Sequence, residues 1–113
     1  MGEKSLPQEW IDKIALWARG CSAIDSVFVF GSRARGDNKP ESDLDLAVLL
    51  TLGDSDEALA YWIFESDKLK QEVTNLIPVP VDLQLAEPRT DERVWPGVKR
   101  DGRKVYSKMK ISG

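Results

Sequence analysis

Hydrophobic residues in the first part of the chain recur at three- and four-residue steps. Between residues 7 and 19 they are Trp10, Ile11, Ile14, Trp17 and Ala18. This spacing places them on one side of an α-helix. Pro7 suits the first turn of a helix and Gly20 suits its end. We therefore expect an amphipathic helix over residues 7–19, with both tryptophans facing the core rather than a ligand.

Shorter apolar runs predict the strands. Residues 26–30 are β-branched and aromatic, as in a central strand, and residues 43–50 and 79–85 alternate between two faces. Pro80 removes one ladder hydrogen bond, so the strand over residues 79–85 is either an edge strand or broken at its start. Residues 103–107 predict a last strand. Together with the helices, this pattern predicts an α/β (α+β) fold with a small mixed sheet flanked by helices.

A long helix is expected between the second and third strands, ending before Pro78. Its predicted core face consists of Leu59, Trp62, Ile63, Leu69, Val73, Leu76 and Ile77. Tyr61 and Phe64 lie off that face, either as partly buried aromatic residues or as part of a partner interface. Later in the chain, Pro96 and Gly97 interrupt residues 90–102, where we expect a short or kinked helix.

Two carboxylates interrupt the apolar pattern at the start of the second strand. Asp43 and Asp45 are two residues apart and therefore share a face, opposite Leu44 and Leu46. At about 7 Å in a dielectric of about 20, their repulsion is about 2 kcal/mol. A divalent cation would remove it, and oxygen ligands of this kind suit Mg²⁺, which takes its remaining ligands from water and phosphates.

A possible phosphate site precedes this acidic pair. Gly31 and Ser32 follow the first strand directly. A glycine leaving a strand lets the backbone approach an anion, and the next amides and the Ser32 hydroxyl can donate to phosphate oxygens. Arg33 and Lys39 are close by in sequence, and either could contact a triphosphate, remain solvated or pair with a nearby carboxylate.

These motifs together resemble a known family. Gly31-Ser32, ten residues and then Asp43-x-Asp45, with A-R-G after the serine, is similar to the minimal nucleotidyltransferases of the DNA polymerase beta-like superfamily. The resemblance implies that Asp82 is a third carboxylate and that Arg35 belongs to the nucleotide-binding motif. It implies Mg²⁺, with Asp43, Asp45 and Asp82 as ligands and catalytic residues, and transfer of a nucleoside monophosphate, most commonly from ATP, to a hydroxyl.

Composition limits the chemistry and the size of the protein. The chain has 113 residues, so we expect one domain over residues 1–113, without room for a separate acceptor domain. It contains no histidine, which excludes a histidine base or a Ser-His-Asp triad. A net charge of −3 argues against direct nucleic-acid binding. The absence of a long apolar run or signal pattern predicts a cytoplasmic protein, and the single Cys21 is expected to be a small buried residue.

The acceptor must therefore come from outside the chain. Minimal members of the family are commonly paired with a helical HEPN toxin, and the resemblance implies an antitoxin that adenylylates a tyrosine of such a partner. Two alternatives remain open. The protein could be a non-catalytic module that neutralises a partner by binding it, or a small-molecule nucleotidyltransferase whose acceptor site is completed by another subunit.

Overall fold

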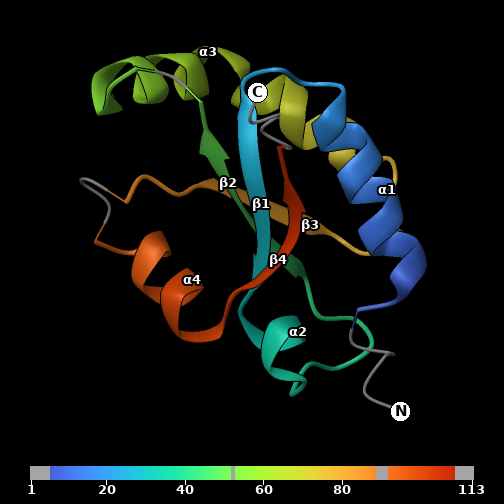
Figure 1. Ribbon diagram of the computed structural model, residues 1–113. Helices are drawn as coiled ribbons and strands as arrows, with labels where there is room; N and C mark the ends of the chain where they lie inside the picture. The colour runs from blue at the N-terminus through green and yellow to red at the C-terminus, as the bar shows by residue number, and fades with distance from the viewer. Residues whose placement is uncertain (1–5, 52, 89–91, 109–113) are drawn as a thin grey trace, which may run out of the picture.

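The computed structural model describes residues 6–51, 53–88 and 92–108, which form a mixed four-stranded sheet with helices on both faces (Figure 1). The elements in chain order are α1 (Gln8–Arg19), β1 (Ile24–Phe30), α2 (Ser32–Arg35), β2 (Leu44–Leu50), α3 (Ser55–Thr74), β3 (Val81–Leu85), α4 (Val94–Asp101) and β4 (Arg103–Ser107). The predicted small mixed sheet flanked by helices is confirmed. No helix among these residues is long and apolar enough to cross a membrane.

The strand order is β3-β2-β1-β4, with β1 antiparallel to both β2 and β4 and with β3 parallel to β2. The strand β3 begins directly after Pro80 and lies at the edge of the sheet. Of the two alternatives expected from this proline, the edge strand is confirmed, because β3 has one neighbouring strand. The strand also begins later than the expected residue 79, at Val81, so the missing N–H of Pro80 falls outside the ladder. The carbonyl of Pro80 still accepts a hydrogen bond of 2.8 Å from the amide of Leu44, which fixes the start of β2 beside β3.

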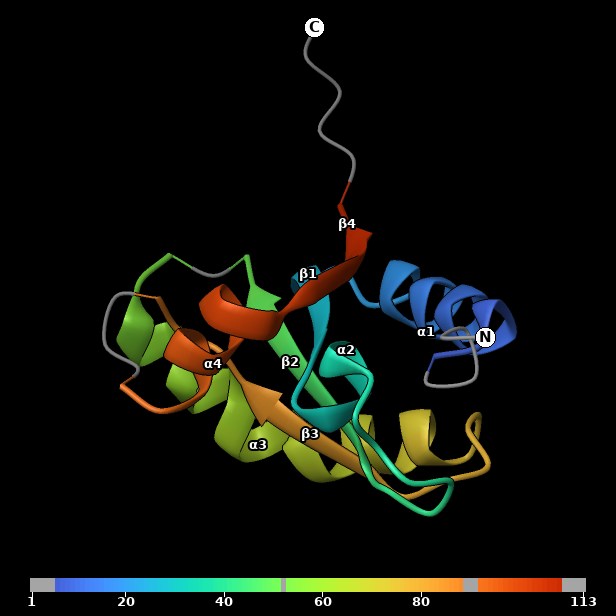
Figure 2. The same cartoon turned by 90° about the horizontal axis from the view of Figure 1, so that it is seen from below.

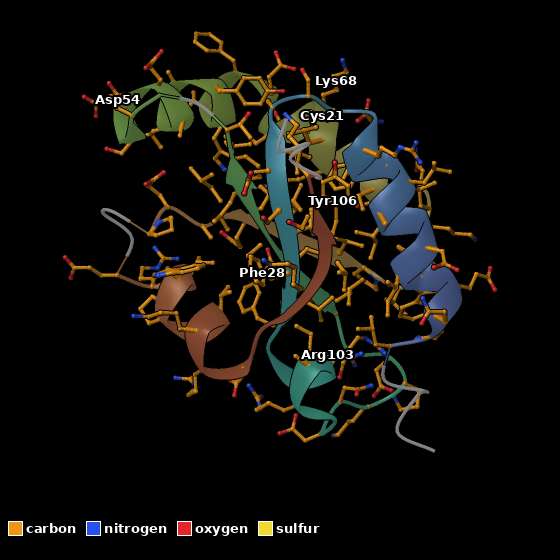
Figure 3. All side chains as sticks on the ribbon, viewed as in Figure 1. Cys21, Phe28, Asp54, Lys68, Arg103 and Tyr106 are labelled. Atoms are coloured by element: carbon orange, nitrogen blue, oxygen red, sulfur yellow. The ribbon has the colours of Figure 1, made fainter. Side chains whose placement is uncertain are left out.

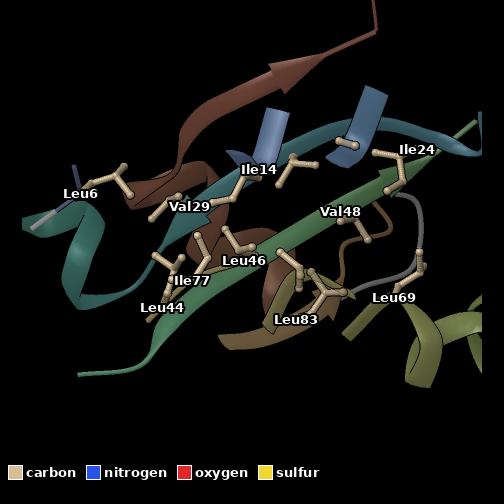
Figure 4. Close-up of a cluster of buried hydrophobic side chains, with 13 residues drawn as sticks. Leu6, Ile14, Ile24, Val29, Leu44, Leu46, Val48, Leu69, Ile77 and Leu83 are labelled. Carbon is tan, nitrogen blue, oxygen red and sulfur yellow. The ribbon is translucent and has the colours of Figure 1, made fainter. Parts of the chain in front are cut away.

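One face of the sheet forms the main core with α1 and α3 (Figures 2 and 4). Leu44, Leu46 and Leu83 point into this core and are at most 1% exposed, as predicted from strand alternation. Ile14 of α1 and Val73 of α3 close it from the helix side. Trp10 and Trp17 are partly buried against the same cluster, so their predicted core role is confirmed.

The opposite face is covered only in part, by α4. Ala47 and Ala86 form a smaller cluster there with Val98 of α4. Phe28, labelled in Figure 3, meets Trp95 edge to face with ring centroids 6.1 Å apart. Pro96 is tolerated because it is the third residue of α4, in the first turn, where no intrahelical donor is needed. The expected interruption at Pro96 and Gly97 therefore produces a short helix without a break.

The core face predicted for α3 was wrong at two positions. Leu59 is 51% exposed and Ile63 is 66% exposed, whereas Ala58, Leu69 and Val73 are buried. The buried stripe is thus rotated from the predicted one in the first half of the helix, because the small Ala58 allows the close approach to the core. The helix also ends at Thr74, earlier than expected, and residues up to Ile77 form a turn.

Tyr61 and Cys21 meet at the end of α1. The Tyr61 hydroxyl and the Cys21 sulfur are 3.5 Å apart. This hydrogen bond, together with burial, raises the pKa of Tyr61 to about 12. Cys21 is partly buried rather than fully buried, and Tyr61 packs against the core as an ordinary partly buried aromatic residue. Phe64 behaves differently, since it is 83% exposed.

Candidate active site

Asp45 and Asp82 lie opposite each other on the adjacent parallel strands β2 and β3. They lie on the α4 face of the sheet, because Asp45 alternates with Ala47, which packs toward α4, and Asp82 alternates with Ala86. Asp43 precedes β2 by one residue, so it is a loop residue rather than the strand residue expected from the sequence. Asp45 and Asp82 thus share one face of the sheet, and Asp43 lies in the loop directly before β2.

The pKa of the Asp45 carboxyl group reflects its surroundings. Burial raises its pKa above the ordinary value, and the negative charges of Asp82 and Asp43 raise it further. Arg35 acts in the opposite direction and lowers it. Each of these effects depends on proximity, so Asp45 lies at the centre of an acidic cluster with one nearby cation.

The turn after β1 lies directly against this cluster. Phe30 is opposite Asp45 in the β1–β2 ladder, and Gly31 follows it with φ 74° and ψ −154°. A Cβ atom at Gly31 would overlap the Oδ2 atom of Asp45. Glycine is therefore required at position 31 for two reasons: the backbone conformation and the lack of space for a Cβ atom beside the carboxylate. Ser32 follows Gly31 as the first residue of α2 and is partly exposed.

Arg35 is held at the rim of the site by two acids. Its Nε atom is 3.1 Å from Oδ2 of Asp37, and its Nη1 atom is 3.4 Å from Oδ2 of Asp101 at the end of α4. These contacts raise its pKa, chiefly through the hydrogen bond to Asp37. The guanidinium is thus fixed near the acidic cluster and shared with Asp37 and Asp101.

Arg33 points into the protein and away from solvent. It is 2% exposed, and its guanidinium lies 5.1 Å from the ring centroid of Trp10. Its Nη2 atom donates to the carbonyls of Pro40 at 3.0 Å and Ser42 at 2.9 Å, and its Nε atom donates to Ser42 at 3.1 Å. Arg33 is therefore neither a phosphate contact nor a solvated side chain, and its contacts tie the loop before Asp43 to α1.

Lys39 has a local role through its backbone. Its amide donates to the Ser42 hydroxyl at 2.8 Å, and its carbonyl accepts from the Ser42 amide at 3.0 Å. These reciprocal bonds make residues 39–42 a tight turn whose carbonyls face Arg33. The exposed Lys39 side chain has no ion pair among the contacts of the described residues.

Sequence reasoning missed two residues that support the site. Gln84 donates from Nε2 to Oδ1 of Asp82 at 2.8 Å. Strand alternation could have revealed it, because residues 82 and 84 share a face. Asp101, the partner of Arg35, is 66 positions away in sequence and gave no local signal.

The donor set fits Mg²⁺ in chemistry and charge, although it is not a preformed cage. Among the described residues, no three histidine, cysteine, aspartate or glutamate side chains are arranged to enclose a metal ion. Magnesium usually binds one or two carboxylates and completes its shell with water and substrate phosphates. Asp45 and Asp82, opposite each other on adjacent strands, are two oxygen donors of this kind.

Comparisons with known proteins identify the family and the fold of the chain. A family model described as "Polymerase beta, Nucleotidyltransferase" matches residues 12–111. No match is found among curated proteins. The structure of a toxin-antitoxin with AMP-PNP is similar, with a TM-score of 0.63 and 24% identity, over 88% of this chain and 74% of that chain.

Two other solved structures have the same fold. The toxin-antitoxin MntA-HepT gives a TM-score of 0.58 at 23% identity, covering 88% of this chain and 72% of that chain. A putative nucleotidyltransferase from Sulfolobus solfataricus gives 0.54 at 22% identity, covering 94% and 86%. At these identities the resemblance establishes the fold of the chain.

Proposed function

Because the chain belongs to the polymerase beta nucleotidyltransferase family, we propose that it transfers AMP from ATP to a tyrosine of a helical HEPN-type toxin and acts as the antitoxin. One observation carries the catalytic part of this proposal. The glycine turn after β1 lies against Asp45, which is flanked by Asp82 on the neighbouring strand. The similar toxin-antitoxin structures support the choice of partner, and the one with AMP-PNP supports an adenine nucleotide.

Each candidate site residue has a separate role in the proposed reaction. Gly31 lets the backbone approach the triphosphate, and the Ser32 amide and hydroxyl donate to its oxygens. Arg35 supplies positive charge beside them. Asp43, Asp45 and Asp82 would hold Mg²⁺, which would neutralise the charge on the phosphates and lower the pKa of the attacking hydroxyl. Holding the reactants in line contributes several kcal/mol to rate acceleration.

In this proposal Asp82 accepts the proton of the acceptor. Its Oδ1 atom already accepts a hydrogen bond from Gln84, which orients the carboxylate and leaves Oδ2 for the tyrosine hydroxyl. The tyrosine oxygen forms a bond to the α-phosphorus, and the bond from that phosphorus to the β-phosphate bridging oxygen breaks. Pyrophosphate leaves, and the hydroxyl proton passes to Asp82. We place this reaction in the cytoplasm, where ATP and Mg²⁺ are abundant.

A labelling experiment tests the function. The purified chain is incubated with ATP labelled at the α-phosphate, Mg²⁺ and the protein encoded beside it. Label on a tyrosine of that protein is the expected result, and Asp43→Asn should abolish it while the variant remains folded. Absence of label on any acceptor, or full labelling by Asp43→Asn, would refute the proposal. Neutralisation of the partner without labelling would instead identify a non-catalytic binding module.

A further inference from the structure

The backbone on both sides of Asp43 is held by residues from other parts of the chain. Asp43 directly precedes Leu44, the first residue of β2. On the strand side, the amide of Leu44 donates a hydrogen bond of 2.8 Å to the carbonyl of Pro80. On the loop side, the carbonyl of Ser42 accepts hydrogen bonds from Nε and Nη2 of Arg33, at 3.1 and 2.9 Å. Both peptide groups that flank the Cα atom of Asp43 are therefore anchored.

Anchored peptide groups fix the direction of the side chain between them. The planes of two successive peptide groups determine φ and ψ of the residue that joins them, and hence the direction of its Cα–Cβ bond. The strand side is fixed by the core, because Leu44 is fully buried. On the loop side, residues 40–42 lie outside any helix or strand, and Arg33 reaches them from α2 (Figure 2). The position of the Asp43 carboxylate therefore depends on the Arg33 guanidinium.

The Arg33 side chain is itself held in one orientation. It is buried, and its guanidinium lies 5.1 Å from the ring centroid of Trp10 in α1. Its Nη2 atom also donates to the carbonyl of Pro40 at 3.0 Å. The turn that presents both carbonyls is closed by the hydrogen bond from the Lys39 amide to the Ser42 hydroxyl. Because a guanidinium presents its donors in a fixed plane, Arg33, α1 and this turn form one rigid unit.

Arg33 also connects Asp43 to the glycine turn. It is the second residue of α2 and follows Ser32 directly. Gly31, on the other side of Ser32, lies against the Asp45 carboxylate. The proposed function assigns the triphosphate to Ser32 and Mg²⁺ to Asp43. The backbone of Arg33 is therefore joined to the phosphate side of the site, and its side chain is bonded to the metal side.

We propose that Arg33 is a positioning residue, which holds Asp43 at the distance from the glycine turn at which both contact the same Mg²⁺-nucleotide. This proposal rests on the proposed function and assigns a further residue to the same site. Arg33 contacts neither the metal nor the nucleotide, and it acts through the Ser42 carbonyl. Residues that hold metal ligands in place typically change metal affinity about 10–100-fold when they are replaced.

Arg33→Lys tests this role while the positive charge beside Trp10 is kept. A lysine ammonium is a point charge whose donors do not form a planar fork. It cannot hold the carbonyls of Pro40 and Ser42 in the geometry that the guanidinium imposes. The variant therefore loosens the backbone before Asp43 and leaves the net charge of the chain unchanged.

Thr51→Val is the matched control at the other end of β2. Thr51 follows the last residue of that strand, and its hydroxyl lies 3.3 Å from the carbonyls of Ser22 and Ala23, to which it donates. Both variants remove hydrogen bonds from a side chain to backbone carbonyls at one end of β2. Only Arg33→Lys changes the end that carries Asp43.

The readout is the Mg²⁺ dependence of ATP binding without any acceptor. Retention of labelled ATP in equilibrium dialysis is measured over a range of Mg²⁺ concentrations, at a temperature where circular dichroism shows all variants folded. We expect Arg33→Lys to raise the Mg²⁺ concentration for half-maximal retention about tenfold or more, and Thr51→Val to leave it unchanged. A purely structural role for Arg33 would lower Tm without changing this Mg²⁺ concentration.

Ser42→Ala provides the test if Arg33→Lys does not fold. It removes the hydrogen bond from the Lys39 amide that closes the same turn, at a partly exposed position. The loss of one neutral hydrogen bond should raise the Mg²⁺ concentration for half-maximal retention about threefold.

The outcomes separate this proposal from the proposed function. An unchanged Mg²⁺ requirement in Arg33→Lys, or in Ser42→Ala where it takes its place, overturns the role of Arg33. If the unaltered chain still labels its partner, the proposed function remains intact. Equal increases in Arg33→Lys and Thr51→Val also overturn this role, because a general loss of stability would then explain both. Absence of Mg²⁺-dependent ATP binding by the unaltered chain refutes the proposed function, and this proposal with it.

Discussion

Replacing Gly31 with alanine tests whether the glycine turn and Asp45 act as one unit. At φ 74° and ψ −154° the backbone occupies a region almost restricted to glycine, where another residue costs about 1–3 kcal/mol. The new Cβ would also overlap Oδ2 of Asp45 and lie 3.1 Å from its Cγ. Overpacking of this kind costs about 1–3 kcal/mol more. The expected loss in the free energy of unfolding is therefore about 2–6 kcal/mol.

Gly36→Ala is the matched control. Gly36 also has positive φ, at 87°, but nothing lies within 4 Å of a Cβ built there. Its cost is confined to the left-handed backbone, at about 1–2 kcal/mol. Both variants strain the chain near α2, and only Gly31→Ala displaces a carboxylate. Comparing the two separates the effect of stability from the effect of geometry at Asp45.

The assay combines thermal unfolding with the initial rate of AMP transfer at a temperature where both variants are folded. Each kcal/mol should lower Tm by about 4–8 °C in a domain of this size. Moving a reacting group by about 1 Å can cost about 100-fold in rate. We expect a loss of that order in Gly31→Ala and a nearly normal rate in Gly36→Ala. Normal transfer by folded Gly31→Ala, or equal losses in both variants, would contradict the reasoning.

Three further predictions concern charge and loop geometry. Asp45→Asn should raise the free energy of unfolding by about 1 kcal/mol, because it removes repulsion from Asp82 and Asp43 at a partly exposed site. In this variant AMP transfer should be lost, and Tm should no longer change when Mg²⁺-ATP is added or when Mg²⁺ is removed with a chelator. Unchanged stability in calorimetry would contradict this prediction. Arg33→Met should cost about 2–4 kcal/mol in urea unfolding, because it removes the hydrogen bonds from the buried guanidinium to the carbonyls of Pro40 and Ser42. Arg33→Lys should recover only part of this loss, and equal losses in the two variants would contradict a role for the planar guanidinium. Asp54→Ala should lower the free energy of unfolding by about 1 kcal/mol, since the Asp54 carboxylate caps α3 by accepting a hydrogen bond of 2.8 Å from the Glu57 amide. AMP transfer should be normal at temperatures below Tm. A change in ATP affinity would contradict a purely local role.

Local patterns predicted where the strands lie, because alternation and turn residues act over a few positions. The strand over residues 43–50 was expected to bury Leu44 and Leu46, and both have 0% exposure. The register of the sheet depends on distant pairs and could not be read in this way. The pairing of Asp45 with Asp82 joins residues 37 positions apart, and it was expected only through the family resemblance.

The errors in α3 and at Arg33 have a common physical cause. A helix with apolar residues on more than half of its circumference has several possible core faces, and the sheet decides between them. Ala58 fits the close approach, so Leu59 and Ile63 turn outward. The direction of Arg33 was likewise decided by partners outside its own segment, the Trp10 ring and the carbonyl of Ser42. Both cases depended on tertiary packing, which local periodicity does not encode.

The charge balance around Arg35 links the fold to nucleotide binding. Arg35 is shared among Asp37, Asp101 and the more distant Asp45, so this one cation cannot neutralise the carboxylates of the site. The remaining repulsion lowers the stability of the ligand-free chain. A ligand that binds only the folded state adds RT ln(1 + [L]/Kd), about 2.7 kcal/mol at 100 times Kd. Stabilisation by Mg²⁺-ATP should consequently depend on Asp45, since the carboxylates that destabilise the free protein are the ones that we propose bind the ligand.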